Sequence, residues 1–570
     1  MTSDTIRRIR SVAAKADQPL EEALKRAESE RQVERLWRKD GTVWKSDDEH
    51  RKNIEGALGW LEVPTFVEAR LSEIEAFADE VRKSFDSVVV LGMGGSSLCP
   101  EVLRRSIGSA EGFPQLHVLD STVPEAVRSL ADRLEIPRTL FIVASKSGST
   151  TEPQMFYRFF RSRLEQSGVA SPGQNFIAIT DPGTLLEGEA KKDGFRRIFL
   201  NPSDIGGRYS ALSLFGMVPA ALAGMNVAAM LRSAQRAMKE SSESASEDNY
   251  SARLGLFLGV CASMGRDKLT IVASPPVDSL GLWIEQLIAE STGKEGLGVL
   301  PVVGQPLGKP SEYGADRVFV WIHTAGFEDA ATEAALDALS AAGHPVVEHL
   351  LGDVLELGGE FFVWEIATAM CGAFLGINPF DQPNVQESKD NTKRFLEDYT
   401  RVGTLPDQPV VAEGDGLKIY AAKASSEAAD PVATLRTHLR SVRPGDYVAI
   451  TQYVPETADH DALLGEIREM VSRSLKVATT TGYGPRFLHS TGQLHKGGGA
   501  NGVFIQITSE DEKDLQIPDQ PFGFSVLKQC QALGDFESLA NRDRRALRVH
   551  LPANVRNGLV HLRDAIQGAL

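Results

Sequence analysis

The chain has 570 residues, of which 42% are hydrophobic and 24% are charged, proportions that are usual for a globular protein. This length predicts two or more domains with a sizeable buried core. The formal net charge of −16 argues against nucleic acid as a general partner, although a local cationic pocket on an acidic surface can still bind an anionic substrate.

The cysteines and the apolar segments indicate the compartment. Four cysteines lie far apart without any Cys-x-x-Cys pair, so the sequence predicts neither a zinc site nor a disulfide framework. Residues 1–31 are charged and lack the apolar core of a signal peptide. The apolar stretch 211–230 contains Pro219, which favours a buried helix over a membrane span. We therefore expect a cytoplasmic protein without a membrane partner.

The first part of the chain predicts helices followed by a parallel sheet. Residues 1–60 are charged and amphipathic, which indicates an N-terminal helical segment. Within the next expected unit, 61–238, apolar strands alternate with helical stretches from residue 87 to residue 200, the pattern of a doubly wound parallel sheet. The expected strands are 88–91, 116–119, 140–143, 176–179 and 197–199.

A glycine-rich turn, Gly92-Met-Gly-Gly-Ser-Ser, follows the first expected strand and opens a helix. Glycines allow the backbone to approach a ligand closely. The dinucleotide fingerprint would need glycine where Ser97 stands, and the Gly-Lys-Ser/Thr of a P-loop is absent. The turn is therefore a Gly-Ser loop that can face a ligand without matching either nucleotide motif.

A second turn, at 145–152, is rich in hydroxyls. The buried strand 139–144 leads into a run of Ser and Thr residues with Lys146 among them, and Thr150 or Thr151 can cap the following helix. Hydroxyls and backbone N–H groups at a helix N-terminus can hold a small dianion, although most such turns are simply solvated. Because both turns follow strands of one parallel sheet, we expect them to converge on one sugar phosphate.

Two further α/β units are expected. Residues 249–404 alternate again after a polar linker at 239–248, with strands at 269–273, 317–322 and 345–349. A boundary with two prolines and three acids, 405–416, precedes the third unit, 417–570. Its expected elements are a helix at 430–442, a strand at 447–451, a helix at 462–475 and a strand at 503–507.

Candidate chemistry lies at the junctions of these units. Arg208 follows two glycines before an apolar helix, where it is either a structural anchor or a donor to a developing oxyanion. Gln286 and Glu290 are four residues apart and share a helix face. A carboxylate on this apolar helix is either a base with a raised pKa or the partner of Lys294 in a salt bridge.

Two later segments carry basic side chains. Lys389 follows Pro383 near the start of an expected helix, where a surface lysine is the simpler interpretation. The Gly-rich loop 484–499 holds His489, His495 and Lys496. Two histidines six residues apart do not have a metal-binding spacing. A functional and a structural role both remain open for this loop.

Taken together and in their order along the chain, the segments described above resemble the glucose-6-phosphate isomerase (phosphoglucose isomerase) family. They resemble more closely the divergent form of this family that occurs fused to transaldolase. The matching segments are 92–100, 145–153, 206–210, 286–294 and 376–389, with a looser match at 489–497. The resemblance implies an α/β fold of two doubly wound parallel-sheet sugar-isomerase (SIS) domains, 61–238 and 249–404, with a C-terminal α/β extension. No transaldolase half is evident in the sequence.

The resemblance implies reversible isomerisation of D-glucose 6-phosphate and D-fructose 6-phosphate, by ring opening and proton transfer through a cis-enediol intermediate, without a metal or cofactor. Glu290 would be the base, Arg208 would stabilise the enediolate, and Lys389 with a histidine would open the ring. The implied substrate-binding residues are Gly95, Ser96, Ser145, Lys146, Ser147, Thr150, Gln286 and Gln382.

The sequence departs from the family pattern in two respects. Asn384 and Ser388 stand where the family commonly has glycine. The family's ring-opening histidine lies between the base and the lysine, whereas the matching segment here follows both. We therefore expect His489 in that role, with His495 as the second candidate. Because the family usually takes this histidine from a neighbouring subunit, a homodimer is expected.

Three other functions remain open at this point. A dual phosphoglucose/phosphomannose isomerase would also accept mannose 6-phosphate. A non-catalytic sugar-phosphate sensor would usually carry a basic helix-turn-helix, and none stands out in the sequence. A transferase-linked amidosugar isomerase would need an N-terminal nucleophilic cysteine, whereas the first cysteine here is Cys99.

Overall fold

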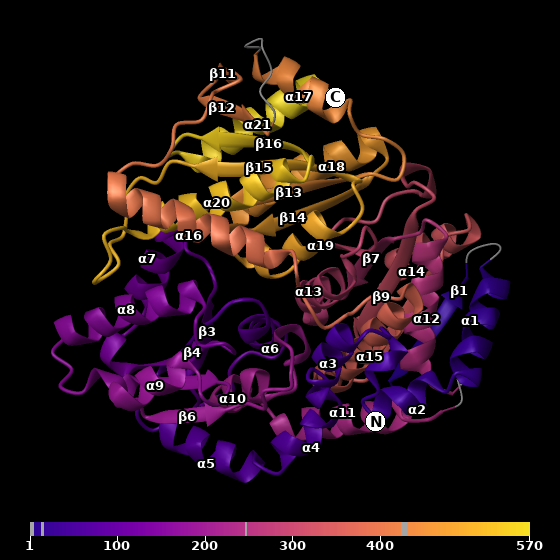
Figure 1. Cartoon of the computed structure of the whole chain (residues 1–570), viewed down its shortest axis with the longest axis horizontal. Coiled ribbons are helices and arrows are strands. Elements are labelled where there is room, and N and C mark those ends of the chain that lie inside the picture. Colours follow the sequence, from indigo (N-terminus) through magenta and orange to yellow (C-terminus); the bar gives the residue numbers. More distant parts are fainter. Residues whose placement is uncertain (1–4, 13–15, 245–247, 423–429) are drawn as a thin grey trace.

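The protein consists of three α/β units, each built around one sheet (Figure 1). The computed structural model describes residues 5–12, 16–244, 248–422 and 430–570. Residues 245–247 of the expected linker lie outside the described residues. The expected mixed α/β class with parallel sheets is confirmed.

The first unit contains the doubly wound sheet that was predicted. Its strands run parallel in the order β3-β2-β4-β5-β6. Their bounds are β2 Ser87–Leu91, β3 Gln115–Leu119, β4 Thr139–Ala144, β5 Phe176–Thr180 and β6 Arg197–Leu200. Because β2 pairs directly with β4, the two loops that follow these strands leave the sheet side by side.

Both faces of this first sheet are covered. Val88 and Val90 of β2 enter one hydrophobic cluster, whereas Val89 and Leu91 enter another, as the alternation of side chains along a strand requires. The helices of this part of the chain are α4 Val63–Glu68, α5 Leu71–Val81, α6 Leu98–Ser106, α7 Pro124–Arg133, α8 Thr151–Gln166, α9 Leu185–Lys192, α10 Leu214–Leu222 and α11 Val227–Ser241.

The second unit has a five-stranded sheet in the order β1-β10-β9-β7-β8. The bounds are β1 Ile6–Ser11, β7 Lys268–Ala273, β8 Leu300–Val303, β9 Arg317–Thr324 and β10 Val346–Leu351. Strands β7 to β10 pair in parallel. The helices are α1 Asp17–Ser29, α2 Gln32–Trp37, α3 Asp48–Glu55, α12 Tyr250–Ser263, α13 Leu280–Thr292, α14 Ala330–Ala341, α15 Leu357–Leu375 and α16 Val385–Val402.

The prediction that residues 1–60 are helical was wrong at the start of the chain. Strand β1 pairs antiparallel with β10 and closes one edge of the second sheet. Ion pairs fix it there, since Arg7 reaches buried Glu360 at 2.9 Å and Arg8 reaches Glu348 at 2.7 Å. This short strand contains three arginines and lacks the apolar alternation by which a half-buried strand is predicted. The arginines are paired instead with carboxylates of residues far away in the sequence.

The third unit has a six-stranded sheet in the order β11-β12-β16-β15-β13-β14. Its strands are β11 Ala412–Gly414, β12 Leu417–Ala421, β13 Tyr447–Tyr453, β14 Ala478–Tyr483, β15 Gly502–Ser509 and β16 Arg545–Leu551. Its helices are α17 Pro431–Leu439, α18 Ala458–Leu475, α19 Gly492–Gly497, α20 Phe524–Asn541 and α21 Val555–Ala569. Asp430 caps α17 as expected, because its side chain accepts from the N–H of Ala433.

Helix α16 connects the second and third units. It precedes the boundary expected at 405–416, yet it lies along α20 of the third unit (Figure 1). The approach is close, since a Cβ on Gly534 would lie 2.9 Å from the main-chain nitrogen of Thr392. The second unit therefore places one of its helices directly on the third.

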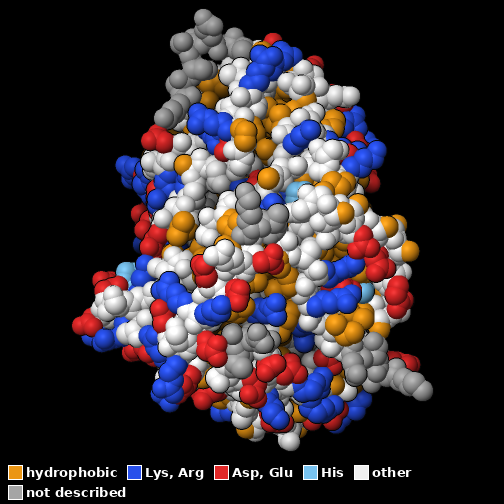
Figure 2. Space-filling model, turned by 90° about the vertical axis from the view of Figure 1, so that its right-hand side faces the viewer, with side chains coloured by type: hydrophobic (Ala, Val, Ile, Leu, Met, Phe, Trp, Pro, Cys, Tyr) orange, Lys and Arg blue, Asp and Glu red, His pale blue; other side chains and the backbone are white. Residues whose placement is uncertain are grey.

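None of the described helices is long and apolar enough to span a bilayer. Helix α10, from the apolar stretch at 211–230, is buried along its whole length. On the face shown in Figure 2, acidic and basic side chains are interspersed.

The largest hydrophobic cluster runs through the first and second units and centres on α15. Residues 357–372 of α15 are buried all around the helix, so it behaves as a core helix without an amphipathic face. Helix α12 lies so close to α15 that a Cβ on Gly255 would overlap the main-chain oxygen of Ala367. The two helices therefore depend on glycine at this contact.

We predict different effects on the melting temperature for two Gly→Ala substitutions. Gly255→Ala should lower the melting temperature, because overpacking against backbone typically costs about 1–3 kcal/mol. Gly465→Ala, in α18 with nothing within 4 Å of its Cβ position, should leave it unchanged or raise it slightly, since alanine favours a helix by about 0.5–1 kcal/mol. Differential scanning calorimetry of both variants checks this. Equal shifts would contradict the close contact.

Candidate active site

A cavity of about 310 Å³ opens at the carboxyl end of the first sheet. Four segments that are far apart in the sequence form its walls: the loop 147–152, the start of α16, the loop before α19, and α20. The polar side chains on these walls include Ser147, Ser149, Thr150, Glu152, Lys389, His489 and Gln531. The site therefore combines all three units.

The hydroxyl loop lies at the N-terminus of α8 as predicted. Ser147, Ser149 and Thr150 line the cavity, and Gly148 adopts a left-handed conformation with φ of +66°. Ser145 lies behind them, where its hydroxyl is 2.9 Å from that of Thr150 and accepts from the N–H of Gly148 at 3.1 Å. Hydroxyls in front of a 16-residue helix form a site suited to an anion. Ser149 was not among the predicted binding residues.

Lys146 does not line this cavity. Its ammonium group donates to the main-chain oxygen of Ser203 at 2.7 Å and pairs with the carboxylate of Asp181. Asp181 leaves the neighbouring strand β5. In this structure Lys146 therefore ties two loops of the first unit together.

His489 reaches the cavity from the third unit of the same chain. Its Nε2 lies 3.5 Å from Oε1 of Glu152, which also accepts from the amide of Gln531 at 2.7 Å. Burial disfavours the charge on Glu152, but the hydrogen bond and charge of His489 and the charge of Lys389 hold the pKa of this carboxyl below its usual value. Sequence reasoning missed Glu152 as a site residue, because Gln531 and His489 are more than 330 positions away in sequence.

His495 lies outside the cavity, in the core of the third unit. It is 2% exposed and packs against the rings of Tyr447, Phe487 and Phe504. Burial lowers its pKa to about 3. His495 is therefore a neutral core residue, and His489 is the histidine that meets the other predicted side chains.

Lys389 projects from the first turns of α16 as an exposed side chain that lines the cavity. Both departures from the family pattern lie beside it and contact the third unit. The hydroxyl of Ser388 donates to that of Ser538 at 3.1 Å. The side-chain oxygen of Asn384 accepts from the amide of Gln493 at 2.8 Å, and the main-chain N–H of Asn384 donates to the amide oxygen of Gln493 at 2.9 Å. Side chains larger than glycine thus fasten α16 to the third unit.

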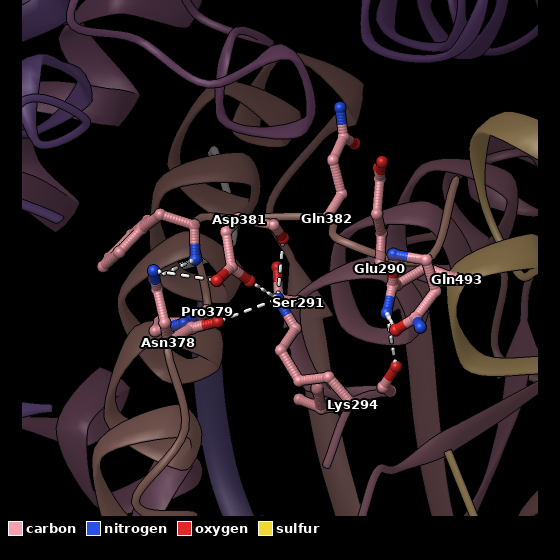
Figure 3. Close-up of polar contacts among 12 residues, drawn as sticks. Glu290, Ser291, Lys294, Asn378, Pro379, Asp381, Gln382 and Gln493 are labelled. Carbon is pink, nitrogen blue, oxygen red and sulfur yellow. Dashed lines mark hydrogen bonds and ion pairs between the residues drawn. The ribbon is translucent and has the colours of Figure 1, made fainter. Parts of the chain in front are cut away.

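Glu290 and Arg208 form a second group of predicted residues, which are 4% and 3% exposed. Their nearest charged atoms, Oε1 of Glu290 and Nη1 of Arg208, are 3.6 Å apart. The alternative salt bridge between Glu290 and Lys294 is wrong, because Lys294 pairs with Asp381 at 2.7 Å. Figure 3 shows Glu290 and Gln382 extending to the same side, away from Lys294.

Arg208 is a structural anchor as well as a neighbour of Glu290. Its Nε donates to the hydroxyl of Ser291 at 2.8 Å, and its Nη2 donates to the main-chain oxygens of Pro379 and Asp381 at 2.8 and 2.7 Å. Its Nη1 lies 3.5 Å from Oε1 of Gln382. One arm of the guanidinium thus remains directed at the candidate base and at Gln382.

Gln286 joins the two groups. Its amide donates to Oε2 of Glu290 at 3.2 Å and to the main-chain oxygen of His489 at 2.6 Å. The same amide faces the Gly-Ser loop, where a Cβ on Gly94 would lie 2.8 Å from it. Among the described residues, His489 lines the cavity, whereas Gln286 and Glu290 do not. The histidine therefore lies between the hydroxyl loop and the candidate base.

The Gly-Ser loop approaches the Arg208 segment without space for side chains. A Cβ on Gly95 would overlap the main-chain oxygen of Gly207, and Ser210 donates to the main-chain oxygen of Gly95 at 3.2 Å. Ser96 ends the short 3-10 turn Gly94–Ser96 and is 9% exposed. The glycines thus serve close packing of two loops at the site.

Comparison with known proteins supports the identification of these segments. The family model described as phosphoglucose isomerase matches residues 66–297. A glucose-6-phosphate isomerase from Staphylococcus aureus strain Mu3 is 28% identical over 388 residues, covering 60% of this chain and 86% of that protein.

Two solved structures have similar folds. A hypothetical protein from Thermus thermophilus is 25% identical with a TM-score of 0.56, covering 68% of this chain and 99% of its own. A glucose-6-phosphate isomerase from Chlamydia trachomatis is 18% identical with a TM-score of 0.54, covering 67% of this chain and 87% of its own. The similarity to the Chlamydia trachomatis protein shows a shared fold only.

Glu285, next to Gln286 on α13, adds a titratable group behind the histidine loop. Its carboxyl accepts from the hydroxyl of Ser490 at 3.3 Å. Burial raises its pKa to about 7, against the opposing effects of Ser490, Arg468 and Arg486.

We predict that Glu285 makes the protein less stable as the pH rises. The native state keeps a proton that the unfolded state, with an ordinary pKa of 4.5, releases. The free energy of unfolding should therefore fall between about pH 4.5 and 7. In Glu285→Gln this slope should be smaller, as measured by urea unfolding across that range. Exposed Glu135 provides the control Glu135→Gln, and equal slopes in all three proteins would contradict the prediction.

Proposed function

This chain belongs to the phosphoglucose isomerase family through the match at 66–297, and we propose that it interconverts D-glucose 6-phosphate and D-fructose 6-phosphate. The reaction is an aldose–ketose isomerisation, in which the ring opens and a proton moves between C2 and C1 through a cis-enediol. The observation that carries this proposal is the bridge made by Gln286 between Glu290 and the main chain of His489, which sets a base beside a ring-opening histidine.

The substrate phosphate would bind at the hydroxyl loop. Ser147, Ser149 and Thr150 supply hydroxyl donors, and the positive end of the α8 dipole lies behind them. Neutral donors suit this role because they hold a dianion without pairing permanently with a carboxylate, as Lys146 does with Asp181. Ser145 would act by orienting Thr150.

Glu290 would transfer the proton. Its carboxylate takes a proton from one of the two carbons and returns it to the other, so it begins and ends each turnover ionised. The Nη1 of Arg208 lies 3.6 Å from this carboxylate and can stabilise the enediolate charge. Gln286 holds the other carboxylate oxygen, and Gln382 can donate to the sugar hydroxyls near Arg208.

His489 and Lys389 would open the ring. One moves a proton to the ring oxygen and the other removes one from the C1 hydroxyl, which leaves the open-chain aldose. Glu152 lies 3.5 Å from Nε2 of His489 and is itself held by Gln531. Glu152 therefore acts as a positioning residue that sets the orientation of the imidazole.

The position of His489 changes the argument for an oligomer. The expected homodimer rested on a histidine donated by a neighbouring subunit, whereas His489 reaches the cavity from its own chain. We infer that each site is complete within one chain. The homodimer remains a prediction, but a histidine donated by a neighbouring subunit no longer supports it. The cytoplasmic location and the likeness to the form fused to transaldolase also remain predictions.

We expect Glu290→Gln to lower kcat for fructose 6-phosphate by about 10²–10⁴-fold, because it removes the general base. Binding of the substrate, measured by calorimetry, should remain. The control is Glu295→Gln at the exposed partner of Lys45, which should keep wild-type activity. A fully active Glu290→Gln would refute the assigned base. A wild type that binds sugar phosphates without turnover would support a sensor, and turnover of mannose 6-phosphate would indicate dual specificity.

A second experiment tests whether His489 acts within its own chain. Glu290→Gln and His489→Ala should each be inactive, and refolding them together should restore nothing, because every chain still lacks one group. If histidines were exchanged between subunits, the co-refolded mixture would regain about a quarter of wild-type activity, since about half of the dimers would be mixed and one of the two sites in each mixed dimer would be intact. Coupled assays of the co-refolded mixture distinguish these outcomes.

A further inference from the structure

A second cavity, of about 410 Å³, lies in the third unit away from the hydroxyl loop. Its walls are the segment 405–410 that follows α16, one face of strands β12, β15 and β16, and helix α20. Arg548 and His550 are two residues apart on β16 and therefore project from the same face of the sheet. The roles proposed above for the active-site residues do not use this cavity.

Arg548 is a buried cation on the wall of this cavity. It is 9% exposed, and no carboxylate of the described residues forms an ion pair with it. Its guanidinium stacks on the ring of Tyr420, 4.1 Å from the centroid, and its Nε has no hydrogen-bond partner among the described residues. Burial lowers the pKa of Arg548 to about 10. A buried guanidinium without a counter-ion is costly, so its retention suggests a bound anion.

Gln408 offers a second unsatisfied group on the opposite wall. Its Oε1 is buried and has no hydrogen-bond donor among the described residues. A buried carbonyl oxygen requires a donor such as a hydroxyl. The two groups together fit a ligand that carries both a negative charge and hydroxyls.

The remaining charges of the cavity limit the ligand to a low charge. Asp407 and Glu510 also lie on its walls, and Glu510 accepts from His550 at 3.2 Å. His550 in turn meets the hydroxyl of Thr508 at 2.9 Å, so this corner is satisfied internally. One guanidinium facing two carboxylates favours a monoanion over a phosphate dianion. A carboxylate also matches the planar fork of arginine.

The walls of the cavity connect to the active site through two helices. The segment 405–410 continues α16, which carries Lys389, and α20 carries Gln531, which holds Glu152. Leu405 packs against the hydrophobic cluster that contains Leu533 of α20, and both residues line the cavity. An occupant of the cavity would therefore contact α20 and the segment that follows α16, which are joined to the ring-opening groups.

We propose that this cavity is a regulatory site for a small hydroxylated carboxylate, with Arg548 binding the carboxylate and Gln408 accepting from a hydroxyl. Binding changes the activity of the enzyme through α16 and α20. Only this second statement rests on the proposed isomerase function.

Isothermal titration of the full chain with D-gluconate tests the site. We expect saturable binding by the wild type and at least about 10-fold weaker binding by Arg548→Met, which keeps the length and apolar contacts but removes the donors. The matched control is Arg556→Met, at an exposed arginine of the same unit, which should bind as the wild type does. Ser147→Ala should also bind equally, because its change lies at the hydroxyl loop.

Gluconate should also shift kcat or KM for fructose 6-phosphate at least about twofold in the wild type and not in Arg548→Met. Absence of gluconate binding, or equal binding by Arg548→Met, overturns the site. Tighter binding of inorganic phosphate than of gluconate overturns the ligand class. Binding without a kinetic effect overturns the coupling. Should Arg548→Met not fold, Gln408→Leu takes its place with the same expected loss, and the calorimetry decides the site even if no isomerase activity is found.

Discussion

The proposed active site depends on one hydrogen bond between units, from the side chain of Gln286 to the main-chain oxygen of His489, 203 positions later in the chain. Because the same amide also contacts Glu290, it fixes the spacing between the proposed base and the proposed ring-opening histidine. The acceptor is a backbone carbonyl, which every residue type provides. The position of the loop is therefore set independently of the imidazole, whose own orientation depends on Glu152.

Other polar contacts join the third unit to the first unit, so the third unit forms part of the wall of the site. Arg486 holds Asp120, at the end of β3, through two hydrogen bonds of 2.8 Å, and both side chains are largely buried. Gln531 holds Glu152 from α20. Buried charges compensate their desolvation only with such forked geometry and extra donors. Helix α20 also borders the cavity at Arg548, which links the proposed regulatory site to this wall.

The departures from the family pattern have a common physical explanation. Asn384 and Ser388 stand where glycine is common in the family, and both hydrogen-bond the third unit. A chain that covers its own site with an additional α/β unit needs such contacts at the start of α16. The same unit carries His489 into the cavity. The unusual residues and the late histidine therefore both follow from the third unit lying against the site.

The sequence by itself determined the parallel sheet of the first unit, because apolar runs that alternate with helical stretches indicate buried strands. It also singled out the hydroxyl loop and the Glu290 helix as candidates, and only the family resemblance gave them functional roles. It did not reveal β1, whose arginines are satisfied by Glu348 and Glu360, nor Glu152, whose partners lie more than 330 positions away. It also left His489 and His495 as alternatives. Only the tertiary structure separated them, since one imidazole meets a carboxylate in a cavity and the other is enclosed by aromatic rings, and such surroundings are made by segments that no local pattern connects.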